Sequence, residues 1–159
     1  MTNNLTGTVI VVSDRIVGGL REDKAGPVAR RLLADAGVEA EVVTVGEGLE
    51  EVSRALADAR SRGRRVIVTV GGTGLGPRNQ TPEATAPLLG VRLDGLVTQV
   101  LIQGLASTGQ AGLSRALIGL TGRGPGDALI INSPGSAGGV NDTLGVVCPL
   151  LPNIFERIG

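Results

Sequence analysis

Two short runs of glycine, hydroxyl and amide residues are the parts of this sequence best suited to chemistry. Gly71-Gly72-Thr73-Gly74 follows the apolar run at 66–70, and Asn132-Ser133-Pro134-Gly135-Ser136 follows the apolar run at 128–131. Glycine lets bare backbone approach a ligand, and clustered N–H groups beside a hydroxyl can hold an anion such as a phosphate. The alternatives are a tight turn that needs positive φ for the first run and a turn with a helix cap at Ser136 for the second.

Polar residues elsewhere extend these two candidate sites. The segment at 75–85 is polar and contains two prolines; Arg78 in it either meets a phosphate or is a solvated loop charge, and Thr81 is expected to cap a helix opened by Pro82. Asp14 ends another apolar run, where a carboxylate either orders a loop or holds a metal-bound phosphate. Ser114 and Arg115 precede a further apolar segment.

The elements that would position these residues can be predicted from hydrophobic patterning. Short β-branched apolar runs predict strands at 8–13, 38–45, 65–70 and 128–131, and apolar residues at helical spacing predict helices at 29–36 and 49–59. This alternation is typical of a parallel sheet covered by helices on both faces. Because parallel strands place their carboxyl ends along one edge, we expect the small polar turns to converge there on a cleft for a phosphate-bearing ligand.

The second half of the chain is less regular. A short helix is predicted at 82–89, a helix at 93–106 with Leu96, Val100 and Leu101 turned inward, and closing helical segments at 140–147 and 154–158. The segment at 113–120 fits either a strand or a buried helix. No repeat or linker separates these elements, so we expect a single domain over residues 1–159.

Composition excludes several classes of function. The chain has 159 residues, no His, one Cys, 1% aromatic residues and equal numbers of acidic and basic residues. Catalysis by Ser-His-Asp or Cys-His groups and the common zinc sites are therefore excluded. With almost no aromatic platform for base stacking and no net positive charge, nucleic-acid binding is not expected. Cys148 is read as a structural thiol.

The motifs taken together resemble the molybdopterin-binding Mog/MoaB family of molybdenum-cofactor biosynthesis. In the family's order the chain has Val-Ser-Asp-Arg at 12–15, Glu-Asp-Lys-Ala-Gly-Pro at 22–27, Gly-Gly-Thr-Gly at 71–74, Pro-Arg-Asn-Gln-Thr-Pro-Glu-Ala-Thr at 77–85, Leu-Ser-Arg at 113–115 and Asn-Ser-Pro-Gly-Ser at 132–136. The resemblance implies a three-layer α/β/α sandwich with a mostly parallel sheet. It also implies binding of molybdopterin and, in enzymatic members, transfer of AMP from ATP to its terminal phosphate with Mg²⁺.

The resemblance assigns roles to individual residues. Asp14, Glu47 and Asn79 match positions near the reaction, with Asp14 and Glu47 as Mg²⁺ ligands and Asn79 as a positioning residue. The expected substrate-binding residues are Gly71, Gly72, Thr73, Gly74, Arg78, Ser114, Arg115, Asn132, Pro134, Gly135 and Ser136.

Three departures from the family pattern concern acidic positions. Asn79-Gln80 stands where the family usually has Asp-Val, Gly46-Glu47 where it usually has Pro-Asp, and Thr98 where it usually has Glu. An Asn side chain brings no negative charge to a metal ion. Three hypotheses therefore stay open: a molybdopterin adenylyltransferase, a non-catalytic molybdopterin-binding or scaffolding protein, and a generic nucleotide-binding α/β protein.

Assembly and location complete the expectations. Residues 96–105 and 113–120 are aliphatic and carry few charges, which fits either a subunit contact or the core, and the resemblance implies a homotrimer or a dimer of trimers. It also makes other molybdenum-cofactor biosynthesis proteins candidate partners. The segment at 1–7 lacks a basic, apolar leader pattern, and no apolar stretch reaches the ~18 residues of a membrane span. We expect a cytoplasmic protein.

Overall fold

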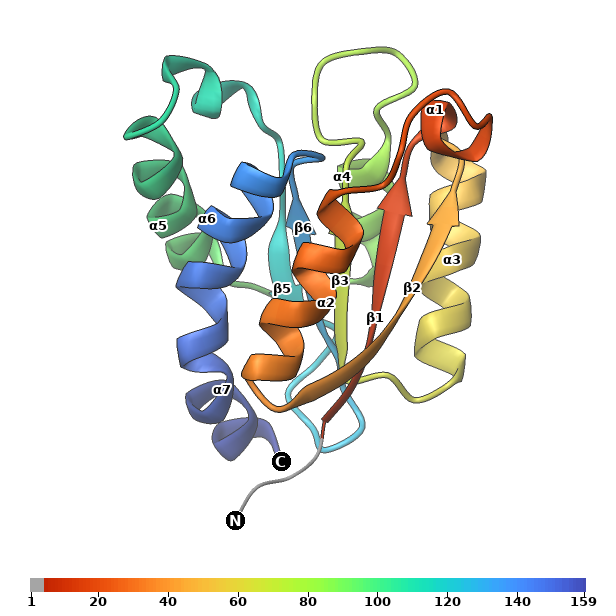
Figure 1. Ribbon diagram of the computed structural model, residues 1–159. Coiled ribbons are helices and arrows are strands. Elements are labelled where there is room, and N and C mark those ends of the chain that lie inside the picture. The colour runs from red at the N-terminus through yellow and green to blue at the C-terminus, as the bar shows by residue number, and fades with distance from the viewer. Residues whose placement is uncertain (1–4) are drawn as a thin grey trace.

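The core of the structure is a six-stranded sheet with the order β2-β1-β3-β6-β5-β4 (Figure 1). The computed structural model describes residues 5–159; the expectation about a leader segment falls partly on residues 1–4, which lie outside this range. Strands β2, β1, β3 and β6 are parallel, whereas β5 is antiparallel to both β6 and β4. The strands comprise β1 (Leu5–Val12), β2 (Val38–Val45), β3 (Val66–Val70), β4 (Val91–Arg92), β5 (Ile118–Leu120) and β6 (Leu129–Ser133).

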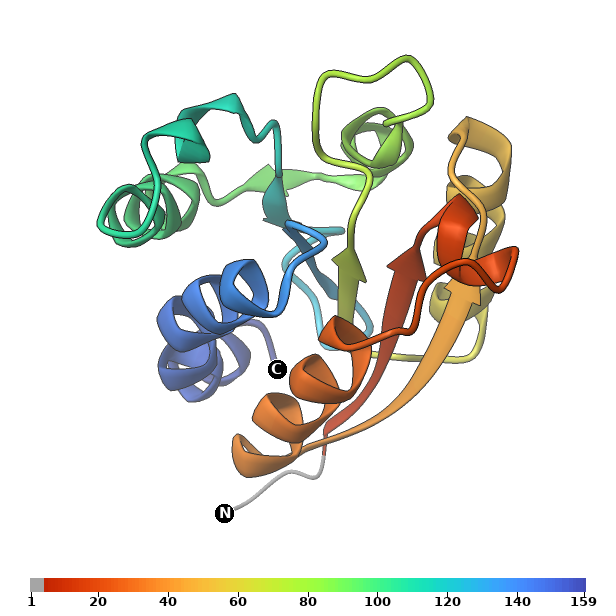
Figure 2. The same ribbon diagram turned by 45° about the horizontal axis from the view of Figure 1, so that its top comes forward.

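Helices cover both faces of this sheet, so the expected mostly parallel α/β/α architecture is confirmed (Figure 2). On one face pack α2 (Ala25–Asp35), α6 (Ala137–Val147) and α7 (Leu151–Ile158), with α5 (Asp94–Leu105) beside α6. On the other face pack α3 (Leu49–Ser61) and α4 (Thr81–Thr85). The remaining helical pieces are α1 (Asp14–Val17) and 3-10 turns at Ala86–Leu88, Gly109–Leu113 and Cys148–Leu150.

Strand β1 is an example of a core strand whose side chains are apolar and buried on both faces of the sheet. Val9 and Val11 pack into the cluster under α2 and α6, whereas Ile10 and Val12 pack into the cluster under α3. Successive side chains of a strand point to opposite faces, so a strand covered on both faces reads as a continuous apolar run. All four of these side chains are buried.

The segment at 113–120, the orientation of Leu101 and the role of Thr81 were left open or predicted differently from the sequence. The ambiguous segment at 113–120 resolves into the end of a 3-10 turn and strand β5. Leu101, expected to face inward, is 37% exposed, because α5 lies at the edge of the molecule and buries none of its residues fully. Thr81 does not cap a helix: α4 begins at Thr81 itself, and the Thr81 hydroxyl donates to the carbonyl oxygen of Gly71 instead (3.0 Å).

Cys148 behaves as a structural thiol. It is half-buried between α6 and α7, and burial raises the pKa of the thiol to about 11. The reactive thiolate form is therefore scarce at neutral pH. Within residues 5–159, no helix combines the length and apolarity needed to cross a membrane.

Candidate functional site: two adjoining pockets at the carboxyl edge of the sheet

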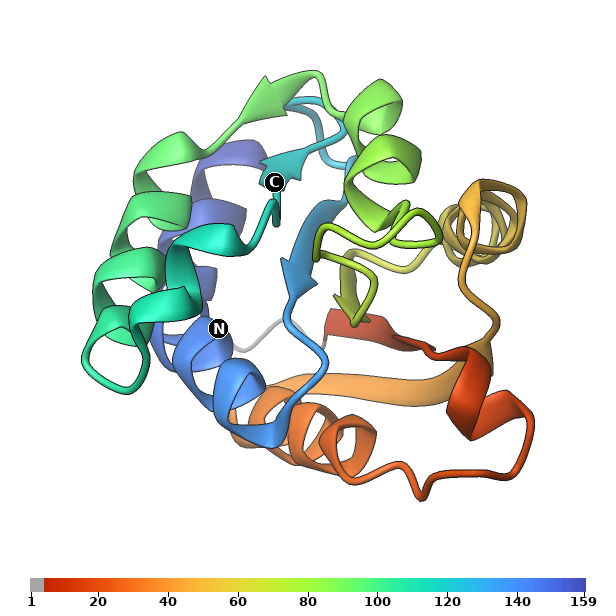
Figure 3. The ribbon, with the colours of Figure 1, turned by 90° about the horizontal axis from the view of Figure 1, so that it is seen from above.

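The carboxyl ends of β1, β3 and β6 lie side by side. In the parallel register Val11 is paired with Val70, and Val70 with Ser133, so the turns that follow these strands start at one edge (Figure 3). The backbone N–H of Gly71 also donates to the carbonyl oxygen of Ser133 (3.0 Å). The convergence of the small polar turns, expected from the sequence, is present in the structure.

The first two glycines of the 71–74 loop are required by its geometry. Gly71 has φ of 107° and Gly72 has φ of 71°, both in the left-handed region. A Cβ at Gly71 would lie 2.4 Å from the carbonyl oxygen of Val12, and one at Gly72 would lie 2.2 Å from the hydroxyl of Thr81. Both positions exclude side chains, so the loop backbone stays uncovered toward the cleft.

Thr73 and its neighbours line a polar pocket of about 410 Å³ at this edge. Eight of the expected site residues contribute to it, namely Glu47, the four residues of the 71–74 loop, Asn79, Gly135 and Ser136. The walls of this polar pocket are formed by Val11, Val12, Ser13, Arg15, Ile16, Arg21, Glu22, Asp23, Lys24, Ala25, Glu47, Val70, Gly71, Gly72, Thr73, Gly74, Asn79, Gly135, Ser136 and Ala137.

A second, mostly apolar pocket of about 380 Å³ lies between α5, the 3-10 turn that follows it and α6. Ser136 lines both pockets, so they adjoin there. Of the expected site residues, Ser114, Asn132 and Pro134 line this apolar pocket. Its walls are formed by Val97, Val100, Leu101, Gly104, Ser107, Thr108, Gln110, Ala111, Gly112, Ser114, Ala116, Ile118, Asn132, Pro134, Ser136, Gly138, Gly139, Asp142 and Thr143.

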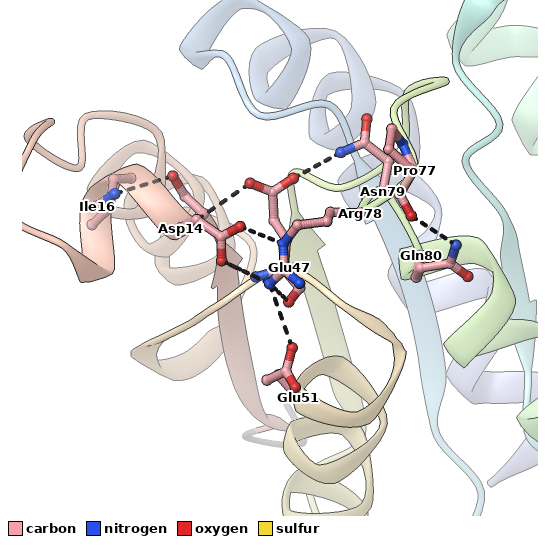
Figure 4. Close-up of polar contacts among 9 residues, drawn as sticks. Asp14, Ile16, Glu47, Glu51, Pro77, Arg78, Asn79 and Gln80 are labelled. Carbon is pink, nitrogen blue, oxygen red and sulfur yellow. Dashed lines mark hydrogen bonds and ion pairs between the residues drawn. The ribbon is translucent and has the colours of Figure 1, made fainter.

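Asp14, Glu47, Arg78 and Asn79 form one hydrogen-bonded cluster beside the polar pocket (Figure 4). The Arg78 guanidinium donates to both carboxylate oxygens of Asp14 (2.7 and 3.1 Å) and to the backbone carbonyl of Glu47. The Asn79 amide donates to Glu47 Oε1 (2.7 Å), and the backbone N–H of Glu47 donates to Asp14 (2.9 Å). Arg78 holds the pKa of Asp14 below its usual value, assisted by that backbone bond.

The donor set of this cluster decides how a divalent cation would fit. Asp14 and Glu47 lie close together, as expected for metal ligands, but no group of three or more acidic, His or Cys side chains within residues 5–159 could hold a metal. Mg²⁺ is often held by one or two carboxylates and completed by substrate phosphates. The cluster fits that arrangement once Arg78 releases Asp14. Thr98 lines neither pocket and donates within α5.

Arg115 and Asn132 are placed by bonds within the protein. Arg115 donates to the carbonyl oxygens of Gly74 (2.9 Å) and Asn79 (2.7 Å) and pairs with Glu83 (2.5 Å), so it fixes the 74–83 loop and lines neither pocket. Asn132 is buried, and its amide bonds hold the segment before β5 to β3 and α4.

The hydroxyl of Ser136 acts as the expected helix cap. It accepts from the backbone N–H of Gly139 (3.0 Å) at the start of α6. The Ser114 hydroxyl accepts from the N–H of Ala116 (3.3 Å) at the mouth of the apolar pocket. Both serines therefore shape backbone at the junction of the pockets in addition to lining them.

Several charged residues that line the pockets were not assigned a role from the sequence. Arg15, Arg21 and Lys24 bring positive charge to the polar pocket, and Asp142 brings a carboxylate to the apolar pocket. Asp142 stands one and a half turns into α6, with no local motif to mark it. Lys24 lies within the 22–27 motif quoted above, which is the signal that could have identified it.

Comparisons with known proteins agree with this geometry. The family model described as "Probable molybdopterin binding domain" matches residues 8–153. The structure of a putative molybdenum cofactor biosynthesis protein from Corynebacterium diphtheriae is 47% identical, with a TM-score of 0.90 over 97% of each chain. A molybdenum cofactor biosynthesis bifunctional protein of Synechococcus elongatus is 35% identical over 92% of this chain and 45% of its own length.

A molybdopterin adenylyltransferase of Helicobacter pylori is 28% identical over 94% of this chain and 85% of its own length. The chain spans between 22% and 47% of the length of the first four curated relatives it matches. The family match nevertheless covers most of the chain and every cluster described above. The chain belongs to the molybdopterin-binding family of molybdenum-cofactor biosynthesis proteins.

Proposed function

We propose that this protein binds molybdopterin across the two pockets and transfers AMP from ATP to the terminal phosphate of molybdopterin. The observation that carries the proposal is the meeting of a polar pocket and an apolar pocket at Ser136. A pterin needs apolar walls with few polar groups, whereas phosphates need N–H donors and cations. One ligand with both parts fits this junction.

The polar pocket is suited to phosphate by its backbone. The N–H groups of Gly72, Thr73 and Gly74 have no acceptor within residues 5–159, so they are available to an anion. The N-terminal ends of α2 and α6 also face this pocket through Ala25 and Ala137. Unpaired N–H groups and aligned peptide dipoles make helix N-termini favourable for negative charge.

The side chains around the polar pocket would offset the charge of a triphosphate. Arg15, Arg21 and Lys24 line it and form no ion pair within residues 5–159. In the proposed reaction, a phosphate oxygen of molybdopterin attacks the α-phosphorus of ATP. A new P–O bond forms, the bond from the α-phosphorus to the bridging oxygen breaks, and pyrophosphate leaves with that electron pair. The cations stabilise charge on this leaving group.

Mg²⁺, if held by Asp14 and Glu47 together with ATP phosphates, would neutralise charge on the pyrophosphate. Arg78 has a role of its own in this cluster. The Arg78 guanidinium pairs with Asp14 and donates to the backbone carbonyl of Glu47, so it holds the 71–80 loop against α1 and the segment that follows β2. Phosphate oxygens compete for the same guanidinium, and a nucleotide that takes Arg78 frees the Asp14 carboxylate.

Incubation of the purified protein with molybdopterin, ATP and Mg²⁺ tests the proposal. Saturable formation of adenylylated molybdopterin and pyrophosphate is the expected result. Tight molybdopterin binding without AMP transfer would refute the enzyme and favour the scaffolding alternative. Tight ATP binding that does not depend on a pterin would favour a generic nucleotide-binding protein.

Asn79→Asp is expected to increase both divalent-cation affinity and AMP transfer. In the protein the Asn79 amide donates to Glu47 Oε1, whereas a carboxylate there would add a third acidic ligand. Two adjacent carboxylates repel each other until a cation binds between them. Mn²⁺ titration followed by electron paramagnetic resonance measures the affinity separately from activity, and Asn141→Asp on the exposed side of α6 is the matched control. Equal Mn²⁺ affinity in all three proteins would contradict the prediction.

For assembly, we propose that exposed apolar residues of α5 and of the 3-10 turn at Gly109–Leu113 contact another copy of the chain in a homotrimer or dimer of trimers. Ile102, Leu105 and Leu113 are 64%, 49% and 54% exposed, and such clustered apolar surface marks contact sites. The other candidate contact segment, residues 113–120, ends in strand β5, whose residues are buried in the sheet and are not available for a subunit contact. Light scattering at micromolar concentration is expected to give a trimer or hexamer for the native protein and a smaller species for Ile102→Glu. A native monomer would contradict the assembly.

A further inference from the structure

The apolar pocket contains a carboxylate that nothing in the protein uses. Asp142 lies on α6 and faces α5: a Cβ on Gly104 of α5 would lie 4.0 Å from Asp142 Oδ2. Among residues 5–159, Asp142 is the one acidic side chain that lines this pocket, and no Lys or Arg lines it. Within the same residues, the Asp142 carboxylate accepts no hydrogen bond and forms no ion pair. Its neighbours in α6, Asn141 and Thr143, bond to backbone carbonyls instead.

The Asp142 carboxylate is half-buried and has no partner within residues 5–159, so it is free to accept hydrogen bonds from a ligand. The ligand that satisfies it best presents two parallel N–H donors, because a carboxylate accepts two such bonds side by side. The walls that accompany Asp142 are the aliphatic side chains of Val97, Val100 and Ile118, which favour the faces of a flat ring. The pocket is therefore suited to a flat heterocycle that has two parallel N–H donors on one edge.

We propose that Asp142 recognises the pyrimidine edge of the pterin, accepting hydrogen bonds from ring N3–H and the 2-amino group. This inference rests on the proposed function, since it assigns the pterin part of molybdopterin to the apolar pocket. The two donor nitrogens of a pterin are both bonded to C2, and their N–H bonds point in the same direction, as those of a guanidinium do. Asp142 is then a specificity-determining residue that distinguishes a 2-amino pterin from a 2-oxo pteridine.

The chemistry of the 2-position gives the proposal a sharp test. A lumazine has the pterin ring system with a carbonyl in place of the 2-amino group. That carbonyl oxygen would face a carboxylate oxygen, and one hydrogen bond would be replaced by repulsion. In Asp142→Asn the amide oxygen still accepts from N3–H, and the amide NH₂ donates to the lumazine carbonyl. The substitution therefore reverses the pattern of donors and acceptors at one position.

The experiment measures the dissociation constants of 6-hydroxymethylpterin and 6-hydroxymethyllumazine by NMR titration, with molybdopterin as reference ligand. The native protein is expected to prefer the pterin by about 10-fold to 100-fold, the range set by a hydrogen bond to a charged group. Asp142→Asn is expected to lose or invert this preference. Glu156→Gln, the same chemical change at an exposed residue of α7, is expected to keep it. Melting temperatures confirm that each variant is folded.

The outcomes separate this inference from the function on which it rests. If the native protein binds molybdopterin and Asp142→Asn keeps the full preference for the pterin, the assignment of Asp142 is wrong and the proposed function stands. If the native protein does not bind molybdopterin, both are wrong. If Asp142→Asn alone loses the preference while ATP binding is unchanged, the pterin edge lies at Asp142.

Discussion

Replacing Gly71 by alanine is expected to lower the free energy of unfolding by about 3 kcal/mol and to abolish phosphate binding in the polar pocket. Gly71 has φ of 107°, and the new Cβ would lie 2.4 Å from the carbonyl oxygen of Val12. That oxygen belongs to the end of β1 and cannot move without disturbing the sheet. The strained variant must shift the 71–74 loop, whose free N–H groups are the proposed phosphate donors.

Gly145→Ala provides the matched control for this prediction. Gly145 lies in α6 with nothing within 4 Å of a new Cβ, so the same substitution is expected to stabilise by up to about 1 kcal/mol. Because the chain has no Trp or Tyr, urea unfolding is followed by far-ultraviolet circular dichroism. If Gly71→Ala were as stable as Gly145→Ala, the described geometry of the loop would be wrong.

Asn132→Ala is expected to lower the free energy of unfolding by about 3 kcal/mol. The Asn132 side chain is buried, accepts from the N–H of Leu117 (3.0 Å) and donates to the hydroxyls of Thr69 (2.9 Å) and Thr85 (3.0 Å). Alanine leaves the Leu117 N–H and the Thr69 hydroxyl without these partners and creates a cavity. Leu117 leads into β5, so the wall of the apolar pocket is expected to loosen as well.

Asn141→Ala removes an amide of the same type from an exposed site with one bond, to the carbonyl of Ala137. Its effect is expected to stay within about 0.5 kcal/mol. Hydrogen exchange of the Leu117 N–H offers a local readout, because that proton loses its acceptor only in Asn132→Ala. Unchanged exchange at Leu117 together with native stability would show that Asn132 does not hold this segment.

The central strands of the sheet could be predicted from the sequence because each one is a short, continuous run of apolar residues. The predicted strand at 38–45 coincides with β2, and those at 8–13, 65–70 and 128–131 match β1, β3 and β6 within three residues at either end. These runs are β-branched and apolar on both faces, which few other structures accommodate. The edge at 113–120 was ambiguous because three residues of strand carry too little periodicity.

The site could be located from the sequence but its internal bonds could not. The convergence of the turns followed from parallel topology alone. The partners of Arg78, Arg115 and Thr81 depend on long-range contacts: Asp14 lies 64 residues from Arg78, and Gly74 lies 41 residues from Arg115. Thr81 stands directly before Pro82, as a helix cap would, but its hydroxyl donates to the carbonyl oxygen of Gly71, ten residues earlier in the chain.

Asp142 could not be identified as a candidate site residue from the sequence. A single Asp in an amphipathic helix is normally a solvated charge, and its sequence neighbours give no reason to read it otherwise. Only the packing of α5 beside α6 places an apolar wall opposite it. The resemblance to the family indicated molybdopterin as the ligand, whereas Asp142 could be identified as a candidate contact for it only from the structure.

A crystal structure of this protein with adenylylated molybdopterin tests the central claim most directly. We predict the diphosphate linkage against the backbone N–H groups of residues 72–74, the pterin in the pocket between α5 and α6, and Ser136 beside the chain that joins them. A pterin bound on any other surface, with the space between α5 and α6 left to solvent, would contradict the account.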